Sequence, residues 1–286
     1  MSRVVESPAH RQVRATLTNL ARKANSLRVD EFDLQQLKEL DIHLDGITLD
    51  ETSPHRPSYF APYPGHSVPE PNDDDLGGAY NGLDDETKYS LARPADRAYV
   101  MDIHLSSYIS YYDLHAQGER APWISKCVGE SAFTNSGLYK YEQPEFGCCH
   151  IAELNDPDYP HVKAIVYNNL VATDPTILYG ELLPILRIML TQLRRQKFMH
   201  QMVTPVLVFS LMGLQTRVIE AFFDTHQLVL RPIKLYDFSH GNRNAFKTFA
   251  EWYIGKPIEI KPRPPDTHAG FDAFCRQLVL GDNMVR

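Results

Sequence analysis

The sequence predicts an α/β (α+β) fold with a central mixed sheet, an antiparallel meander within it and helices on its flanks. Three observations predict this class. Apolar residues recur at helical spacing after Asp174-Pro175, three strand-like runs follow, and a second helical segment covers 244–253. With a short apolar run at 257–260 the element order is α-β-β-β-α-β, which places the core of the fold at residues 174–260.

The part of the chain before this core consists of two segments of opposite charge. Residues 1–29 carry six Lys or Arg and one acid, whereas residues 30–87 carry 15 acids and two bases. Six prolines between positions 54 and 71 interrupt any apolar period. We therefore expect a charged helical or disordered N-terminal arm (1–50), a Pro/Asp-rich linker (51–88) and a globular α/β domain (89–286).

The arm begins with a basic amphipathic helix at 9–28. Its apolar positions recur at helical spacing and basic residues surround them: Val13, Leu17, Leu20 and Ala21 beside Arg11, Arg14, Arg22 and Lys23. Such a helix can contact nucleic acid, acidic lipid or an acidic protein, or fold back on the acidic segment that follows. A protein or nucleic-acid partner is the expectation here.

The cysteines and the lengths of the apolar runs indicate the cellular compartment of the protein. No run of 18 apolar residues exists and residues 1–19 lack the apolar core of a secretory signal, so no membrane span is expected. Cys127, Cys148, Cys149 and Cys275 are then expected to be reduced, in the cytoplasm or nucleus. Adjacent cysteines do not chelate one zinc ion readily, so no metal site is expected from them. They are expected to act as small buried apolar residues, with a nucleophilic Cys149 as the alternative.

Further elements follow from local pattern. Residues 98–112 suit a strand or a short helix, and 161–170 a strand. Asp174 and Pro175 have the chemistry of a helix start, and Pro184 predicts a kink or restart of that helix.

Residues 205–212 are almost continuously apolar, as in a strand covered on both faces. The runs 217–224 and 227–238 form a hairpin through Thr225-His226. A two-residue loop pairs Asp224 with Gln227 and Glu220 with Arg231. The second strand is expected at an edge or with a bulge, because Pro232 has no N–H to donate.

This element order resembles the core of the PD-(D/E)XK, or restriction-endonuclease-like, superfamily. The resemblance implies a carboxylate-bound divalent metal such as Mg²⁺ and a lysine that activates water. The matching positions are Glu181 on the helix, Glu220 or Asp224 on the second strand and Lys234 on the third. The sequence departs from the family pattern at Pro232, which stands where an acid two residues before Lys234 is required.

The same strands, 205–213, 217–224 and 228–238, also resemble a recurrent pattern in uncharacterised fungal proteins. That resemblance implies no activity. Without the nuclease chemistry, Glu220 is expected to form an exposed cross-strand ion pair with Arg231.

The loop 237–243 joins a strand to a helix, a position where α/β folds often bind ligands. Asp237, His240 and Arg243 are therefore candidate binding residues, with a capping loop around Asn242 or Asn244 as the alternative.

The sequence thus favours a soluble intracellular protein that acts as a non-catalytic interaction or ligand-binding module with no cofactor. The alternative is a metal-dependent, nuclease-like enzyme of the PD-(D/E)XK type, or an inactive form of one. An active enzyme requires that Glu181, Glu220, Asp224 and Lys234 converge.

Overall fold

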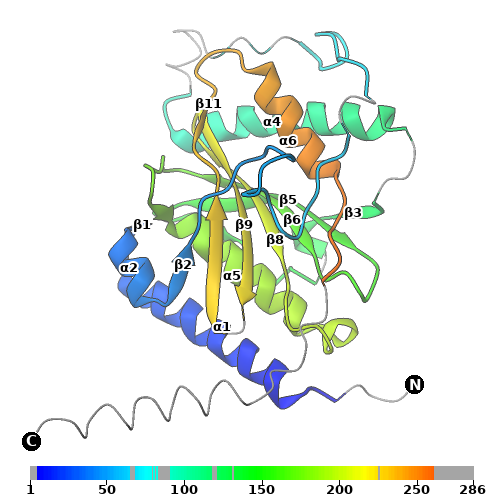
Figure 1. Ribbon diagram of the computed structural model, residues 1–286. Coiled ribbons are helices and arrows are strands. Elements are labelled where there is room, and N and C mark those ends of the chain that lie inside the picture. Colours follow the sequence, from blue (N-terminus) through cyan, green and yellow to red (C-terminus); the bar gives the residue numbers. More distant parts are fainter. Residues whose placement is uncertain are drawn as a thin grey trace, which may run out of the picture.

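A mixed β-sheet between two helical layers forms the protein in the computed structural model (Figure 1), as the sequence predicts. The structure describes residues 5–64, 68–78, 80, 82, 91–117, 121–130, 132–224 and 226–260. Within them the main sheet has nine strands. Seven follow one path: β2 (Ile42–Leu44), β10 (Gln227–Pro232), β9 (Gln215–Asp224), β8 (Val206–Met212), β6 (Val162–Asn168), β5 (Phe146–Leu154) and β3 (Trp123–Lys126).

Short strands complete the β-structure. Within the main sheet, β11 (Tyr236–Asp237) pairs with β9, and β4 (Tyr139–Lys140) pairs with β5; β1 (Glu31–Phe32) and β7 (Ile177–Leu178) form a separate pair. The contacts β6–β8 and β2–β10 are parallel and the other neighbours are antiparallel, so the sheet is mixed. The expected last strand at 257–260 is reduced to one bridge between Pro257 and Phe60.

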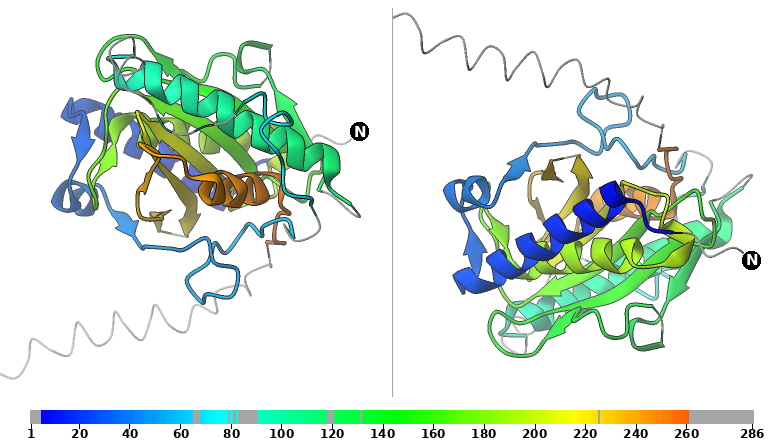
Figure 2. Two further views of the ribbon diagram at one scale, coloured as in Figure 1. Left: turned by 90° about the horizontal axis from the view of Figure 1, so that it is seen from above. Right: turned by 90° about the horizontal axis from the view of Figure 1, so that it is seen from below.

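Two pairs of helices cover the two faces of the sheet (Figure 2). On one face, α1 (Pro8–Leu27) packs on α5 (Tyr179–Leu193); on the other, α4 (Pro94–His115) packs beside α6 (Arg243–Ile254). The short helix α2 (Leu34–Glu39) lies between β1 and β2. Among the described residues, no helix is long and apolar enough to cross a membrane.

The region 98–112 is the central part of α4. The sequence left open a strand or a short helix, and the structure has a helix of 22 residues that begins with Pro94. Proline is accepted there because its missing N–H is one that a first helical turn leaves unpaired. The buried residues recur every three or four positions, from Ala98 through Met101 and Leu105 to Tyr112.

The predicted start of α5 is wrong. Asp174 and Pro175 lie in a turn, and α5 begins at Tyr179, where the carboxylate of Glu181 accepts the backbone N–H of Leu178. A buried side chain thus supplies the N-terminal acceptor. The expected restart at Pro184 is also absent, since α5 continues through it to Leu193.

Gly180 explains how closely α5 approaches the sheet. A Cβ at this position would lie 2.1 Å from Oδ1 of Asn168 on β6 and 2.6 Å from Cβ of Phe146 on β5. Only glycine permits this approach.

The predicted arm packs on the domain. The apolar face of α1, which includes Val13, Leu17 and Leu20, is buried against α5. Residues 42–44 then join the sheet as β2. The predicted N-terminal helix is thus present, and in the described part of residues 1–50 its apolar surface completes the core.

The expected linker also packs, in its described part. Phe60 is fully buried, and the backbone of residues 58 and 59 binds the side chain of Glu220. The prolines prevent regular strand pairing in this segment, but the segment still packs on the core.

The hairpin β9–β10 has the predicted register. Asp224 pairs with Gln227 and Glu220 with Arg231, and Pro232 ends β10 opposite Ile219. The intervening Thr225 lies outside the described residues, as does Cys275.

Candidate functional site

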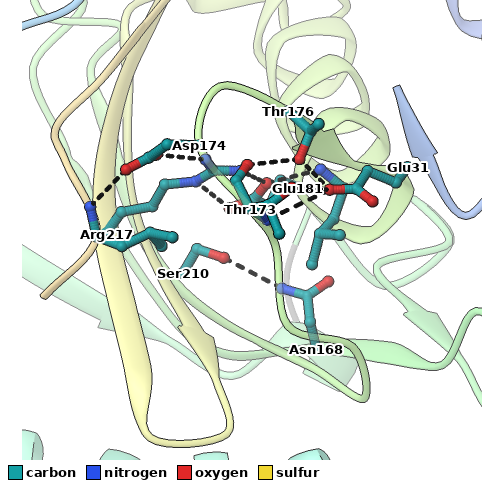
Figure 3. A network of polar contacts seen from close by, with 10 residues as sticks. Glu31, Asn168, Thr173, Asp174, Thr176, Glu181, Ser210 and Arg217 are labelled. Carbon is teal, nitrogen blue, oxygen red and sulfur yellow. Dashed lines mark hydrogen bonds and ion pairs between the residues drawn. The ribbon is translucent and has the colours of Figure 1, made fainter. Parts of the chain in front are cut away.

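Glu181 is bound by an arginine on the α5 side of the sheet (Figure 3). Arg217 Nε donates to Glu181 Oε1 at 2.8 Å, and Arg217 Nη2 donates to Oε2. Both residues are fully buried, and Asp174 lies 3.8 Å from Nη1 of Arg217. The carboxylate is therefore committed to an ion pair and to the backbone N–H of Leu178.

Glu220 lies on the opposite face of the sheet. It is three residues from Arg217 on β9, and side chains alternate along a strand. Its carboxylate accepts the backbone N–H groups of Ser58 at 2.9 Å and Tyr59 at 2.7 Å, and Arg231 Nη1 at 2.8 Å.

The predicted ion pair between Glu220 and Arg231 is thus present, but the expectation that it is exposed is wrong because residues 58–60 cover it. Burial raises the pKa of Glu220, and these three hydrogen bonds oppose that rise.

The four predicted metal and catalytic residues do not converge. Glu181 and Glu220 lie on opposite faces, Asp224 is at the far end of β9 opposite Gln227, and Lys234 is exposed beyond β10. Within the described ranges, no group of three or more His, Cys, Asp or Glu is placed to hold a metal ion. The donor set does not fit Mg²⁺, because its two buried carboxylates each neutralise an arginine.

The loop 237–243 is held by its own contacts. Asp237 accepts the backbone N–H of Ser239 at 2.8 Å, which lowers the pKa of its carboxyl. Arg243 forms an ion pair with Asp73, while His240 is exposed. Asn242 caps α6 by accepting the N–H of Ala245 at 3.1 Å. The contacts match the capping alternative, and ligand binding by Asp237, His240 and Arg243 stays a prediction.

A cavity of about 280 Å³ lies between α4, the β3–β5–β6 side of the sheet and the end of α6. Its polar and aromatic lining comes from four elements: Ser106 and Asp113 of α4, Trp123 and Ser125 of β3, His150 of β5 and Tyr253 of α6. Apolar side chains, among them Ile109 and Ile165, form the rest of the wall.

A buried carboxylate contacts the histidine that lines this cavity. Asp102 projects from α4, its side chain is 9% exposed, and its Oδ2 lies 3.2 Å from Nε2 of His150. The hydrogen bond from the imidazole to Asp102 raises the pKa of His150, although burial opposes this. Ser106 Oγ is 3.4 Å from the same nitrogen.

This geometry differs from a Ser-His-Asp catalytic triad. A triad needs the carboxylate on one ring nitrogen and the hydroxyl on the other, so that the base is oriented while it takes the proton. Here Asp102 and Ser106 both face Nε2 of His150. The histidine is therefore not aligned as a base for Ser106.

Cys149 is the extra residue of a bulge in β5, where the pairing with β6 shifts between Cys148 and His150. Burial raises the pKa of the Cys149 thiol, and the neighbouring carboxylate of Asp102 adds to the rise. A protonated thiol is a poor nucleophile, which argues against the alternative role of Cys149. Cys148 is fully buried, as expected of a small apolar residue.

The sequence pattern drew attention to Cys149, whereas it gave no indication of Asp102, Ser106 and Trp123 as site residues. One signal was available: Asp102 and Ser106 are four positions apart, so in a helix their side chains share a face. The helix could not be distinguished from a strand by its pattern, so this shared face was not recognised.

The outward side of α1 carries the predicted basic contact surface. Arg14 and Arg11 pair with Glu6, while Arg22 and Lys23 are exposed near the turn of the β9–β10 hairpin. A protein or nucleic-acid contact there stays a prediction.

Comparison of the chain with protein-family models, with curated proteins and with solved structures gives no match.

Proposed function

We propose that the protein is a non-catalytic module that binds a small ligand in the cavity beside α4. The observation that carries the proposal is the lining of this cavity, which combines apolar walls, a few hydroxyl groups and one histidine held by the buried carboxylate of Asp102. Ligand sites in proteins commonly have this composition, in which a few polar groups orient a ligand that apolar walls enclose.

The size of the cavity suits a small ligand. Its volume of about 280 Å³ lies just below the usual range for ligand pockets, which is about 300–1,000 Å³. Cavities of about 150 Å³ already bind benzene when their walls are apolar. A single aromatic ring with one polar substituent is therefore a suitable probe.

The geometry favours binding over catalysis. His150 is not aligned as a base for Ser106, and the raised pKa of Cys149 keeps its thiol protonated. The two buried glutamates, Glu181 and Glu220, are occupied by arginines. The nuclease-like alternative remains a prediction from element order, and no observation on these residues favours it.

A library of single-ring aromatic fragments tests the proposal, with protein-observed NMR as the readout. Fragments that bind should shift the indole N–H signal of Trp123 and the methyl signals of Ile109 and Ile165. Ser110→Trp should abolish these shifts, because Ser110 lines the cavity and is exposed enough to accept the larger side chain.

Ser107→Trp is the matched control, since Ser107 lies on the same helix and lines a neighbouring groove rather than the cavity. The proposal is wrong if no fragment shifts the three reporter residues, or if fragments bind equally well to Ser110→Trp.

A further inference from the structure

A buried ammonium group lies against the indole ring that lines the cavity. Nζ of Lys163 on β6 is 4.2 Å from the centroid of the Trp123 ring and 5.8 Å from the centroid of the Phe60 ring. Both separations are within the distance of about 6 Å at which the negative face of an aromatic ring attracts a cation. Lys163 is fully buried, so solvent ions screen its charge very little.

The hydrogen bonds of Lys163 show that its side chain is protonated. Nζ donates to the carbonyl oxygens of Trp252, Tyr253 and Gly255 at 3.0, 2.7 and 2.8 Å. An ammonium group has three N–H donors, whereas a neutral amine has two and would leave one of these oxygens facing its lone pair. The carbonyls belong to the C-terminal end of α6, where the helix dipole is negative. Burial lowers the pKa of Lys163, and these acceptors oppose that fall.

One side of the Trp123 indole is occupied by protein side chains. The centroids of the Trp123 and Phe60 rings are 6.5 Å apart, and their planes are inclined by 23°. Because Nζ of Lys163 is closer to the Phe60 ring than Trp123 is, Lys163 and Phe60 lie on the same side of the indole. The indole N–H donates to the carbonyl oxygen of Gly255 at 2.6 Å, which fixes the orientation of the ring. Since Trp123 lines the cavity, a ligand there contacts the side of the ring that faces away from Lys163.

From this arrangement we propose that the cavity selects an electron-rich aromatic ring, such as a phenol or an aryl ether, which stacks on Trp123. The inference rests on the proposed function and adds the chemical class of the ligand. The ammonium group of Lys163 draws electron density towards its own side of the indole, so the opposite side is less negative than in an isolated ring. A ligand ring with a strongly negative face is attracted to that side, and an electron-poor ring gains less. Lys163 therefore determines the preference through Trp123, without touching the ligand.

Three single-ring compounds of similar shape test the inference: anisole, toluene and benzonitrile. Each is titrated into the full-length protein by NMR, with the methyl signals of Ile109 and Ile165 as reporters, because both residues line the cavity. We expect anisole to bind about fivefold more tightly than benzonitrile, with toluene between them. Lys163→Met keeps most of the side-chain volume and removes the charge, so it should bring the ratio of these two affinities to about one.

Trp123→Leu tests the same preference where Lys163→Met lowers the stability too far for titration. Trp123 is only half-buried, and its replacement removes the stacking surface, so all three affinities should fall and become alike. Lys140→Met is the matched control. It removes an ammonium group that lies 5.2 Å from the centroid of the Tyr179 ring, on the α5 side of the sheet, and it should leave every affinity unchanged.

The outcomes separate the inference from the proposed function. Equal affinities of the three compounds for the wild type, or a preference for benzonitrile, overturn the inference while the ligand-binding function stands. A preference for anisole that persists in both Lys163→Met and Trp123→Leu also overturns it, because the preference then has another source. If none of the three binds but other fragments shift the reporters, the inference is wrong and the function stands. If no fragment binds, both are wrong.

Discussion

Replacing Glu181 by Gln tests how far the ion pair beneath α5 maintains the fold. Glu181 and Arg217 are both fully buried and joined by two hydrogen bonds. The amide keeps the shape of the side chain but turns one acceptor into a donor that faces the guanidinium group. Asp174, half-exposed and 3.8 Å away, is too distant to replace the lost carboxylate.

The magnitude follows from the buried charge left behind. Removing one partner of a buried ion pair costs about 3–5 kcal/mol, while the amide oxygen of the glutamine can still accept the N–H of Leu178. At roughly 2–4 °C per kcal/mol for chains of 150–250 residues, the ion-pair term alone lowers the Tm by about 6–20 °C. Urea unfolding and calorimetry on the same samples measure both quantities.

Two further variants make the result specific. Glu142→Gln, at an exposed site, should stay within about 0.5 kcal/mol of the wild type. Replacing both partners with apolar residues, Glu181→Leu with Arg217→Met, should cost less than the two single changes together, because no charge is left unpaired. The reasoning is refuted if Glu181→Gln unfolds within about 1 kcal/mol of the wild type, or if the single costs simply add.

Three other measurements test the buried groups on the α4 side. Lys163→Met should destabilise the fold by about 1–3 kcal/mol in urea unfolding, because the carbonyls at the end of α6 lose their donor; an unchanged midpoint would contradict the assigned role. Burial lowers the pKa of His161 from 6.5 to about 3, so the unfolded chain binds more protons and stability falls as pH drops from 6.5 towards 3. His161→Phe should flatten that slope, and an unchanged slope would exclude His161 as its source. Maleimide labelling followed by mass spectrometry should modify exposed Cys127 much faster than Cys149, and equal rates would show that the bulge in β5 is open to solvent.

Local sequence pattern was sufficient to predict those elements that depend only on residues close together in the sequence. The register of β9 and β10 follows from a two-residue loop, and it placed Glu220 opposite Arg231 correctly. The apolar face of α1 was likewise visible, since Val13, Leu17 and Leu20 recur at helical spacing. The start of α5 was misread because Asp174 and Pro175 are common in turns as well as at helix starts.

The candidate site depends on contacts that no local pattern contains. Asp102 and His150 are 48 residues apart, and they meet because α4 crosses the face of the sheet onto which the bulge in β5 directs His150. The burial of Glu220 depends on residues 162 and 161 positions earlier, whose backbone N–H groups cover it.

The sequence by itself determined the fold class, the hairpin register and the amphipathic first helix, because periodicity and short turns act over a few residues. The tertiary structure alone decided which carboxylates are neutralised by arginines, that Asp102 meets His150 beside the cavity, and that the N-terminal segment belongs to the core. The physical reason is that desolvation and charge pairing depend on which distant segments pack together, whereas a residue's neighbours in sequence fix only its place on a strand or helix.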